Sequence, residues 1–237
     1  MANLQPLHKD THLNVKLKPL EKLDGLDDQH AIGVVVQEFA LAGSQFPIAF
    51  VQQSEKKGYY PVAIMGLEPN KNLFVNDNGH WEGRYLPARY THQPLAVAQD
   101  PEQKNQYAIA IDMDNEMVQE EEGQRLFKDD GSESEFLAAR KKALTHYVEN
   151  EHITRALCEL LVQHGLLTPQ SIKVKVKDKE YNLNGLYIVD EKKMNELPDE
   201  AFMEIKKRGF LAPIYAHLGS IHQVSSLIQR QDKLLAN

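Results

Sequence analysis

The first half of the chain alternates short apolar runs with turn residues, a pattern typical of β-strands. Four runs rich in β-branched or aromatic residues are bounded by glycine, proline or polar residues, and they span 32–36, 47–51, 60–65 and 107–111. Only the segment 38–45 has the spacing of one or two helical turns. The pattern therefore predicts an antiparallel meander for most of this half, with the run at 107–111 as a buried strand.

A β-hairpin with an aromatic face is predicted next. Residues 73–75 have strand propensity, and Asn78-Gly79 is a dipeptide that takes positive φ at both centres of a type I′ turn. The only tryptophan of the chain, Trp81, and Tyr85 follow on the return side. We expect these aromatic side chains to lie on one face of the hairpin.

From Ser132 the spacing of apolar residues changes to that of a helix. Ser132 and Glu135 fit a capping box, and apolar residues then recur at helical spacing until Gly165. Because this span exceeds ordinary helix lengths, we expect a break near Asn150 that gives two helices.

The remainder of the second half predicts one hairpin and two more helices. Residues 172–176 alternate strictly and 181–189 follow after a short polar turn, with a bulge or bend expected at Asn184-Gly185. Helices are predicted at 198–208, with acidic residues first and basic residues last, and at 213–233. The apolar stripe of the last helix docks on the protein's own core, or alternatively forms a homodimer contact.

These elements predict the α+β class: an antiparallel or mixed sheet from the first half packed with helices, a second hairpin and C-terminal helices. No Gly/Ser-rich or Pro-rich linker divides the chain, so we expect a single domain over 1–237. A subdivision into a β-rich half, 1–115, and a helix-rich half, 132–237, is the alternative. The acidic loop 116–131 would then separate the halves.

The charge of the chain excludes one class of partner, nucleic acid bound without sequence preference. The 237 residues carry a formal net charge of −7, and sequence-independent nucleic-acid binding requires a surplus of Lys and Arg, so no nucleic-acid partner is expected. Four lysines alternate in the second hairpin, and we interpret them as a solvated strand face that discourages edge-to-edge pairing. They are Lys173, Lys175, Lys177 and Lys179.

The single cysteine and the lack of a long apolar segment indicate a compartment. Cys158 has no partner for an intramolecular disulfide, and it falls on the apolar side of a predicted helix as an inert thiol. The N-terminal residues lack the apolar core of a secretory signal, and no stretch approaches the roughly 20 apolar residues of a membrane span. We expect no transmembrane segment and a cytoplasmic location, while export by a signal-independent route stays open.

Motifs for catalysis, metals and cofactors are incomplete. The chain contains no zinc-binding His or Cys pattern, no nucleophile elbow, no phosphate loop and no Rossmann glycine run, so no cofactor is expected. Asp112 and Asp114 are weak candidates for a Mg²⁺ or Ca²⁺ site, because they project to the same side of a strand. Met117 and Val118 stand where an EF-hand needs glycine, and a solvated acidic loop is the preferred interpretation.

Polar and aromatic residues concentrate around the first hairpin and make it the candidate binding site. An arginine fork can hold a carboxylate or phosphate, and Trp or Tyr can stack on a ligand ring. Alternatively, the tryptophan is a core anchor and Arg84 pairs with Glu82 or Asp77. The candidate residues are His80, Trp81, Arg84, Tyr85, Arg89 and Tyr90.

Several short motifs together resemble the SapC-like family of bacterial proteins over nearly the whole chain. They are Glu38-Phe39, Phe46-Pro47-Ile48-Ala49-Phe50, Gly66-Leu67, Asn72-Leu73-Phe74-Val75, Gly79-His80-Trp81, Tyr85-Leu86-Pro87-Ala88, Gly185-Leu186-Tyr187 and Ala216-His217-Leu218-Gly219-Ser220. The chain departs from the family pattern after Arg89-Tyr90, where 91–95 replaces a basic and aromatic run that leads to Pro-Phe.

The resemblance implies a link to surface-layer or envelope export without fixing an activity. The family takes its name from a surface-layer locus, and some members are labelled peptide-transport components. A permease is excluded by the lack of a membrane span. Our leading hypothesis is a soluble, non-enzymatic binding or accessory protein that recognises a protein partner through the surface from Trp81 to Arg89. The alternative is a small enzyme or small-molecule-binding protein that uses Asp112, His80 or Arg84 in a site between the two halves.

Overall fold

The computed structural model describes residues 3–20, 25–53, 58–99 and 107–236, and its contacts divide the chain into two units. Unit 1 comprises residues 1–21 and 88–149, and unit 2 comprises 22–87 and 150–237. Each unit thus combines a segment from before the acidic loop with one from after it. This division differs from the expected separation at 116–131, because the chain enters unit 2, returns to unit 1 and enters unit 2 again.

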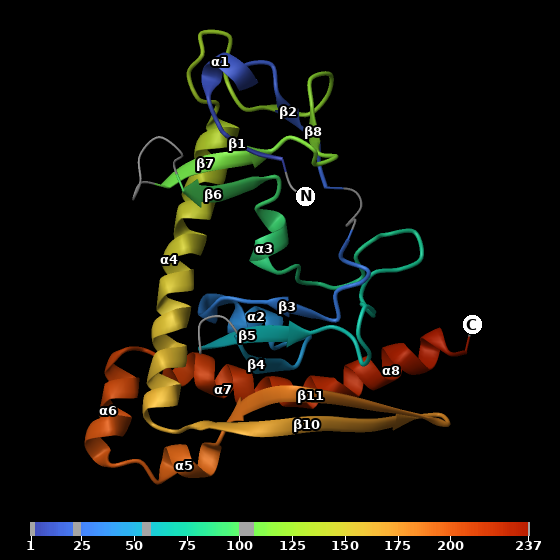
Figure 1. Ribbon diagram of the computed structural model, residues 1–237, viewed down its shortest axis with the longest axis vertical. Coiled ribbons are helices and arrows are strands. Elements are labelled where there is room, and N and C mark those ends of the chain that lie inside the picture. Colours follow the sequence, from blue (N-terminus) through green and yellow to red (C-terminus); the bar gives the residue numbers. More distant parts are fainter. Residues whose placement is uncertain (1–2, 21–24, 54–57, 100–106, 237) are drawn as a thin grey trace. The chain divides into compact units, whose positions relative to one another are not determined.

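Unit 1 contains two small antiparallel sheets (Figure 1). The first has the order β1-β7-β6, and the second has the order β8-β2-β9. The bounds are β1 Leu4–Pro6, β2 Lys16–Leu17, β6 Leu95–Gln99, β7 Tyr107–Asp112, β8 Val118–Gln119 and β9 Gln124–Arg125, with short helices α1 Lys9–His12 and α3 Ala88–Thr91. The run at 107–111 is therefore a strand, as predicted, but it pairs with β1 and β6 instead of extending the meander.

The core of unit 1 draws on both sheets and on the start of a long helix. Apolar side chains from the strands and from the residues next to them pack with two leucines of that helix. The buried members are Val15, Leu17, Leu95, Ile111, Leu126, Phe127, Leu137 and Leu144.

Unit 2 contains one five-stranded antiparallel sheet with the order β10-β11-β4-β5-β3. The bounds are β3 Ala31–Gly33, β4 Ile48–Gln52, β5 Tyr59–Ile64, β10 Leu167–Val176 and β11 Lys179–Val189. The second predicted hairpin joins the first-half strands where Leu186 pairs with Val51 and Tyr187 with Phe50. The sheet is antiparallel and packed with helices, which confirms the α+β prediction.

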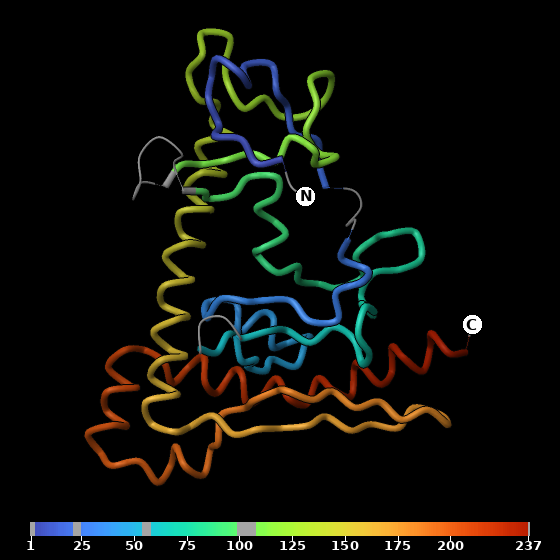
Figure 2. Tube along the Cα trace, in the orientation of Figure 1, coloured from blue at the N-terminus to red at the C-terminus, as the bar shows by residue number. Residues whose placement is uncertain are grey.

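Helices from the C-terminal part of the chain pack on the sheet of unit 2. Figure 2 follows α7 and α8 alongside the β10–β11 hairpin, and α7 contacts both β4 and β11. The bounds are η1 Val36–Glu38, a 3₁₀ turn, then α2 Phe39–Ala42, α5 Glu191–Asn195, α6 Asp199–Lys207, α7 Leu211–Ser220, the 3₁₀ turn η2 Ile221–Gln223 and α8 Val224–Leu234. The last predicted helix is thus two helices joined by a tighter turn.

The long helical span is one helix, α4, over Glu135–Gln163, so the predicted break near Asn150 is wrong. No glycine or proline interrupts this segment, and residues around Asn150 continue the backbone ladder. Thr154 fixes this region in unit 2, because its Oγ1 donates to the Asn150 carbonyl at 2.6 Å and accepts from the Val36 amide at 2.8 Å.

The start of α4 also differs from the predicted capping box. Ser134 is the capping residue, because its Oγ accepts a hydrogen bond from the Leu137 amide at 3.1 Å. Ser132 instead bonds the Asp130 carboxylate at 2.6 Å. The sequence pattern therefore placed the start of the helix two residues too early, at Ser132 instead of Ser134.

The β10–β11 hairpin confirms the predicted hairpin, although β10 begins at Leu167, five residues before the predicted strand. The pairing register shifts between Gln170 and Ile172, opposite Asn184-Gly185, and Gly185 has φ +75°, which places the expected bulge. β10 is an edge strand of the five-stranded sheet, and Lys173 and Lys175 on it are exposed. Lys173 and Lys175 therefore lie at an edge of this sheet, as the alternation predicted. Lys177 lies instead in the turn with φ +53°, and Lys179 begins β11 and pairs with Glu68 at 2.6 Å.

Candidate functional site

The candidate residues fall into two groups. His80, Trp81, Arg84 and Tyr85 lie in a loop of unit 2 that we call the Trp81 loop, residues 76–85. Arg89 and Tyr90 lie on α3, in unit 1. We therefore treat the two groups separately.

A side-chain turn, and not a type I′ hairpin turn, shapes the Trp81 loop. The Asn76 Oδ1 accepts hydrogen bonds from the Asn78 amide at 3.0 Å and the His80 amide at 3.1 Å. Gly79 has φ +79°, whereas Asn78 is not among the residues with positive φ. A single bridge between Val75 and Trp81 replaces the predicted strands, because asparagine competes with the backbone for its own hydrogen bonds.

Trp81 anchors the loop on an aromatic cluster. Its ring centroid lies 5.8 Å from that of Phe74 and 6.1 Å from that of Phe46, and both phenylalanines are buried. Gly83 packs against the indole face, where a Cβ atom would lie only 2.6 Å from the ring. The predicted alternative of a core anchor therefore describes much of the Trp81 side chain, which is partly buried.

Arg230 of α8 packs on Phe74, a member of the same aromatic cluster. Its guanidinium carbon lies 4.0 Å from the centroid of Phe74, and its Nη1 donates to the Leu73 carbonyl at 3.2 Å. The same nitrogen lies 3.4 Å from Glu82 Oε2. Glu82 therefore pairs with Arg230 and not with Arg84, contrary to one of the alternatives considered above.

Arg84 is held by its backbone and not by its charge. Its amide donates to the Gln45 Oε1 at 2.7 Å, and the residue is exposed. Within the described ranges, no ion pair or hydrogen bond involves the Arg84 guanidinium. The loop thus presents one arginine fork to solvent beside the exposed His80.

A buried carboxylate fixes the end of the loop. Glu38 is 5 % exposed, and its Oε1 accepts a hydrogen bond from Tyr85 Oη at 2.6 Å. Its Oε2 accepts from the Val35 amide at 2.8 Å. Tyr85 is therefore a structural link between the loop and η1. Sequence reasoning missed Glu38 and Gln45 as supports of the loop, although a glutamate within an apolar stretch is a signal for a buried, paired carboxylate.

In unit 1, Arg140 organises the segment that follows α3. Its guanidinium donates to three carbonyl oxygens, those of Thr91 at 2.6 Å, His92 at 3.0 Å and Gln93 at 2.6 Å. Burial and the Arg140 charge lower the pKa of the His92 imidazole. Tyr90 is buried and Arg89 is exposed. This is the segment at which the chain departs from the family pattern, and a distant arginine holds it by geometry that no local motif indicates.

Asp112 and Asp114, the candidates for a metal site, accept hydrogen bonds from Asn3, the residue that precedes β1. The Asp112 Oδ1 accepts from the Asn3 amide at 2.8 Å, and Asp114 Oδ1 accepts from the Asn3 side chain at 3.1 Å. Among the residues that the structure describes, no group of three or more His, Cys, Asp or Glu side chains is placed to hold a metal.

Cys158 and His217 have side chains of reactive types, and both are buried. Burial, with a smaller contribution from Glu159, raises the pKa of the Cys158 thiol to about 12, which leaves it protonated and unreactive at neutral pH. His217 lies inside unit 2, where its Nδ1 is 2.8 Å from the Ile48 carbonyl and its Nε2 is 3.1 Å from the Val189 amide. The Val189 amide can only donate, so Nε2 accepts and Nδ1 carries the proton.

Ser220 completes this connection between α7 and the sheet. Its Oγ donates to the His217 carbonyl at 2.6 Å and accepts from the Ile48 amide at 2.9 Å. The motif Ala216-His217-Leu218-Gly219-Ser220 therefore ties one helix to both polar groups of Ile48 on β4. Its histidine and serine have a packing function.

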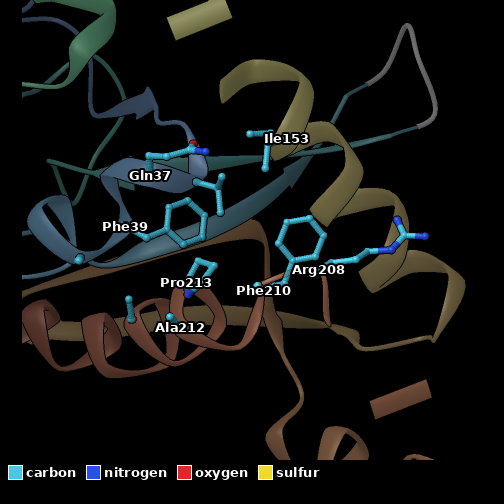
Figure 3. Close-up of a pocket in the computed structure, with 11 residues that line it drawn as sticks. Gln37, Phe39, Ile153, Arg208, Phe210, Ala212 and Pro213 are labelled. Carbon is cyan, nitrogen blue, oxygen red and sulfur yellow. The ribbon is translucent and has the colours of Figure 1, made fainter. Parts of the chain in front are cut away.

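A pocket of about 420 Å³ lies in unit 2, and none of the candidate residues lines it. Its lining comes from η1, α2, α4, the α6–α7 connection and α7, so segments from both halves of the sequence meet there (Figure 3). None of Asp112, His80 or Arg84 lines it. The alternative hypothesis of an enzyme or small-molecule-binding protein requires a pocket that contains several of these three residues. This pocket contains none of them.

Comparison with protein-family models matches residues 7–227 to SapC. The chain belongs to the SapC family. No curated protein and no solved structure matches this SapC-family chain. In the described part of the chain, no helix is both long enough and apolar enough to cross a bilayer.

Proposed function

We propose that this SapC-family protein is a non-enzymatic binding protein, and that the Trp81 loop is its recognition face for a protein partner. We further propose that it acts in the cytoplasm as an accessory to surface-layer or envelope export. The observation that carries the proposal is the contrast between the fixed backbone of the loop and the exposed Arg84 guanidinium, which has no hydrogen-bond or ion-pair partner among the residues that the structure describes.

The rigidity of the loop supports this function. The Trp81 ring, the Asn76 side chain and the Tyr85–Glu38 hydrogen bond fix the loop at three points. A loop fixed in this way loses little conformational entropy when a partner binds, which favours affinity. Solvent-facing polar groups on a rigid loop are a common arrangement for recognition.

The chemistry of Arg84 indicates what the partner would present. A planar guanidinium donates two parallel hydrogen bonds to a carboxylate or a phosphate, and a lysine cannot reproduce this geometry. His80 lies four residues earlier in the same loop and is also exposed. We therefore infer that the partner offers an acidic group to this face.

The test places a photo-crosslinking amino acid at His80 and treats native bacterial lysate with the purified protein. We expect one protein to crosslink reproducibly, and we expect Arg84→Ala to reduce its yield about tenfold or more, consistent with an interface hot spot. Arg84→Lys should restore little, because it keeps the charge and removes the fork.

Arg155→Ala is the matched control, because Arg155 is an exposed arginine on α4 of the same unit. It should leave the crosslink unchanged. The same loss in Arg84→Ala and Arg155→Ala, or an unchanged yield in Arg84→Ala with folding intact by circular dichroism, would remove the Trp81 loop as the recognition face.

A further inference from the structure

We propose that the outer edge of β10 is a docking site for an extended segment of a protein partner in which acidic and apolar residues alternate. The segment would join the sheet of unit 2 as an additional strand beside residues 172–176. This site uses none of the residues of the Trp81 loop, so it goes beyond the proposed function and is tested separately from it.

The backbone of β10 presents hydrogen-bonding groups at this edge. In Figure 1, β10 lies on the outer side of the hairpin that it forms with β11, at the end of the strand order of its sheet. Val176 pairs with Lys179 across a two-residue turn, so these two residues exchange the hydrogen bonds that close the hairpin. Bonds to β11 then recur at every second residue, and the N–H and C=O groups of Lys173 and Lys175 point away from β11. In the described part of the chain, no strand or loop bonds these outward groups.

The usable edge is confined to the second half of β10. In the first half, Pro169 has no N–H to donate, and the bulge between Gln170 and Ile172 interrupts the regular spacing of the backbone groups. Residues 172–176 contain no proline or glycine and keep a regular register with β11. The strand at the opposite end of the sheet, β3, has only 3 residues. The second half of β10 is therefore long enough to pair with a strand of ordinary length.

The lysines of this edge select the charge of the added strand. Lys173 and Lys175 are exposed, and neither forms an ion pair with another described residue. β10 contains no acidic residue. Across the hairpin, Glu180 lies opposite Lys175, whereas Lys173 faces the neutral Asn182. The two ammonium groups therefore oppose a strand with positive charge and attract one whose alternate residues are Glu or Asp.

The other face of β10 selects apolar residues between the acidic ones. Ile172 and Val174 alternate with the lysines and are half-buried, whereas Val176 is buried. An added strand would place its intervening side chains beside Ile172 and Val174 and remove more of their apolar surface from water, which stabilises the pairing. The partner sequence that fits is therefore an alternation of acidic and apolar residues, the complement of 172–176.

The experiment titrates the full chain into a fluorescent peptide of alternating glutamate and valine, and fluorescence anisotropy measures the affinity. We expect saturable binding. A peptide with lysines in place of the glutamates should bind about tenfold or more weakly, because its charges meet the lysines of the edge. A peptide with the same composition but with its glutamates and valines in two separate blocks should lose affinity by about the same factor, since it cannot present the two residue types on opposite faces.

Hydrogen exchange followed by NMR tests strand pairing itself. The Lys173 and Lys175 amides point outward, so their exchange should slow about tenfold or more at saturating peptide. The Val174 amide faces β11 and should change less. Attraction between charges alone would leave the exchange of all three amides unchanged. Binding without protection of the two outward amides would therefore overturn the proposal.

Charge reversal at the edge supplies the test variant and its matched control. Lys173→Glu/Lys175→Glu should weaken binding of the acidic peptide about tenfold or more and strengthen binding of the basic one. Lys206→Glu/Lys207→Glu makes the same change in charge at exposed positions of α6 in the same unit, and it should bind as the native chain does. An equal loss in the two folded variants, or equal binding of the acidic and basic peptides to the native chain, would contradict the assignment.

Two further measurements separate this site from other assignments. If sedimentation shows that the native chain forms dimers, and Lys173→Glu/Lys175→Glu abolishes them, the edge binds a second copy and the proposal is wrong. Arg84→Ala should bind the acidic peptide as the native chain does, and Lys173→Glu/Lys175→Glu should keep the crosslink from His80. Loss of the peptide site alone would therefore leave the Trp81 loop as the recognition face, and the reverse result would leave the edge of β10.

Discussion

Replacing His217 with leucine is expected to lower the free energy of unfolding by about 4 kcal/mol, because it leaves two buried backbone groups without partners, each at a cost of roughly 1–3 kcal/mol. The Val189 amide would lose its acceptor and the Ile48 carbonyl its donor. Leucine has a similar volume, so the change isolates the hydrogen bonds from the packing beside Phe50. Urea denaturation at pH 7 measures the difference.

His222→Leu is the control for this substitution, because His222 is an exposed histidine five residues away. It should change stability by no more than about 0.5 kcal/mol. A loss below about 1 kcal/mol in His217→Leu would show that the two backbone groups find other partners, and that the histidine does not fix α7 to the sheet.

The same residue predicts an acid-dependent loss of stability. Burial lowers the pKa of the folded His217 imidazole to about 4, opposed by the hydrogen bond to the Ile48 carbonyl, from an ordinary value of 6.5. Because the folded-state pKa is depressed, the unfolded chain binds the proton first as the pH falls. The neutral His217 side chain therefore makes its full contribution to the free energy of unfolding above pH 6.5. This contribution is lost between about pH 6.5 and 4, at about 1.4 kcal/mol per pH unit and roughly 3 kcal/mol in all.

Urea denaturation between pH 7 and 5 measures this effect as the difference between the native chain and His217→Leu. Taking the difference removes the contribution of His92, whose lowered pKa acts in the same direction. Parallel curves for the two proteins would contradict the assignment of the proton-linked loss to His217.

Two motif glycines are expected to respond in opposite ways to alanine. A Cβ at Gly66 would lie 1.8 Å from the Lys71 carbonyl oxygen and 3.0 Å from the His30 Cβ, so Gly66→Ala requires the backbone to move and should cost about 3 kcal/mol. Gly219 lies in α7 with no heavy atom within 4 Å of the added Cβ. Gly219→Ala should therefore stabilise the protein by about 0.5–1 kcal/mol through helix propensity.

Thermal denaturation of the two variants under identical conditions tests this pair. The melting temperature should fall for Gly66→Ala and stay level or rise for Gly219→Ala. A decrease of similar size in both would mean that close packing does not distinguish the two sites.

Local patterns predicted the elements whose environment is also local. Strict alternation located the β10–β11 hairpin, and its Asn184-Gly185 bulge followed from backbone conformation. The charge distribution and Gly209 located α6. In α4 the length alone suggested a break, although no residue in the segment disfavours a helix, and tertiary anchoring at Thr154 favours continuity.

The candidate site was less predictable because its geometry depends on distant residues. The sequence indicated Trp81 as important and placed Phe74 in the same hairpin, but two further residues of the cluster, Phe46 and Arg230, lie far from Trp81 in sequence. The pocket combines segments near 36–40, 153 and 208–216, which no local pattern connects. The spacing of residues in the sequence does not predict contacts between side chains that only the folded chain brings together.

The free edge of β10 has a consequence for how the protein behaves at high concentration. In the part of the chain that the structure describes, no strand pairs with the outer side of β10, so its backbone groups can extend the sheet into a second molecule. The charges of Lys173 and Lys175 oppose this pairing. Acetylation of these amines would remove the repulsion and leave Ile172 and Val174 in an alternating pattern suited to strand addition. Two exposed side chains therefore oppose self-association of the protein at this edge.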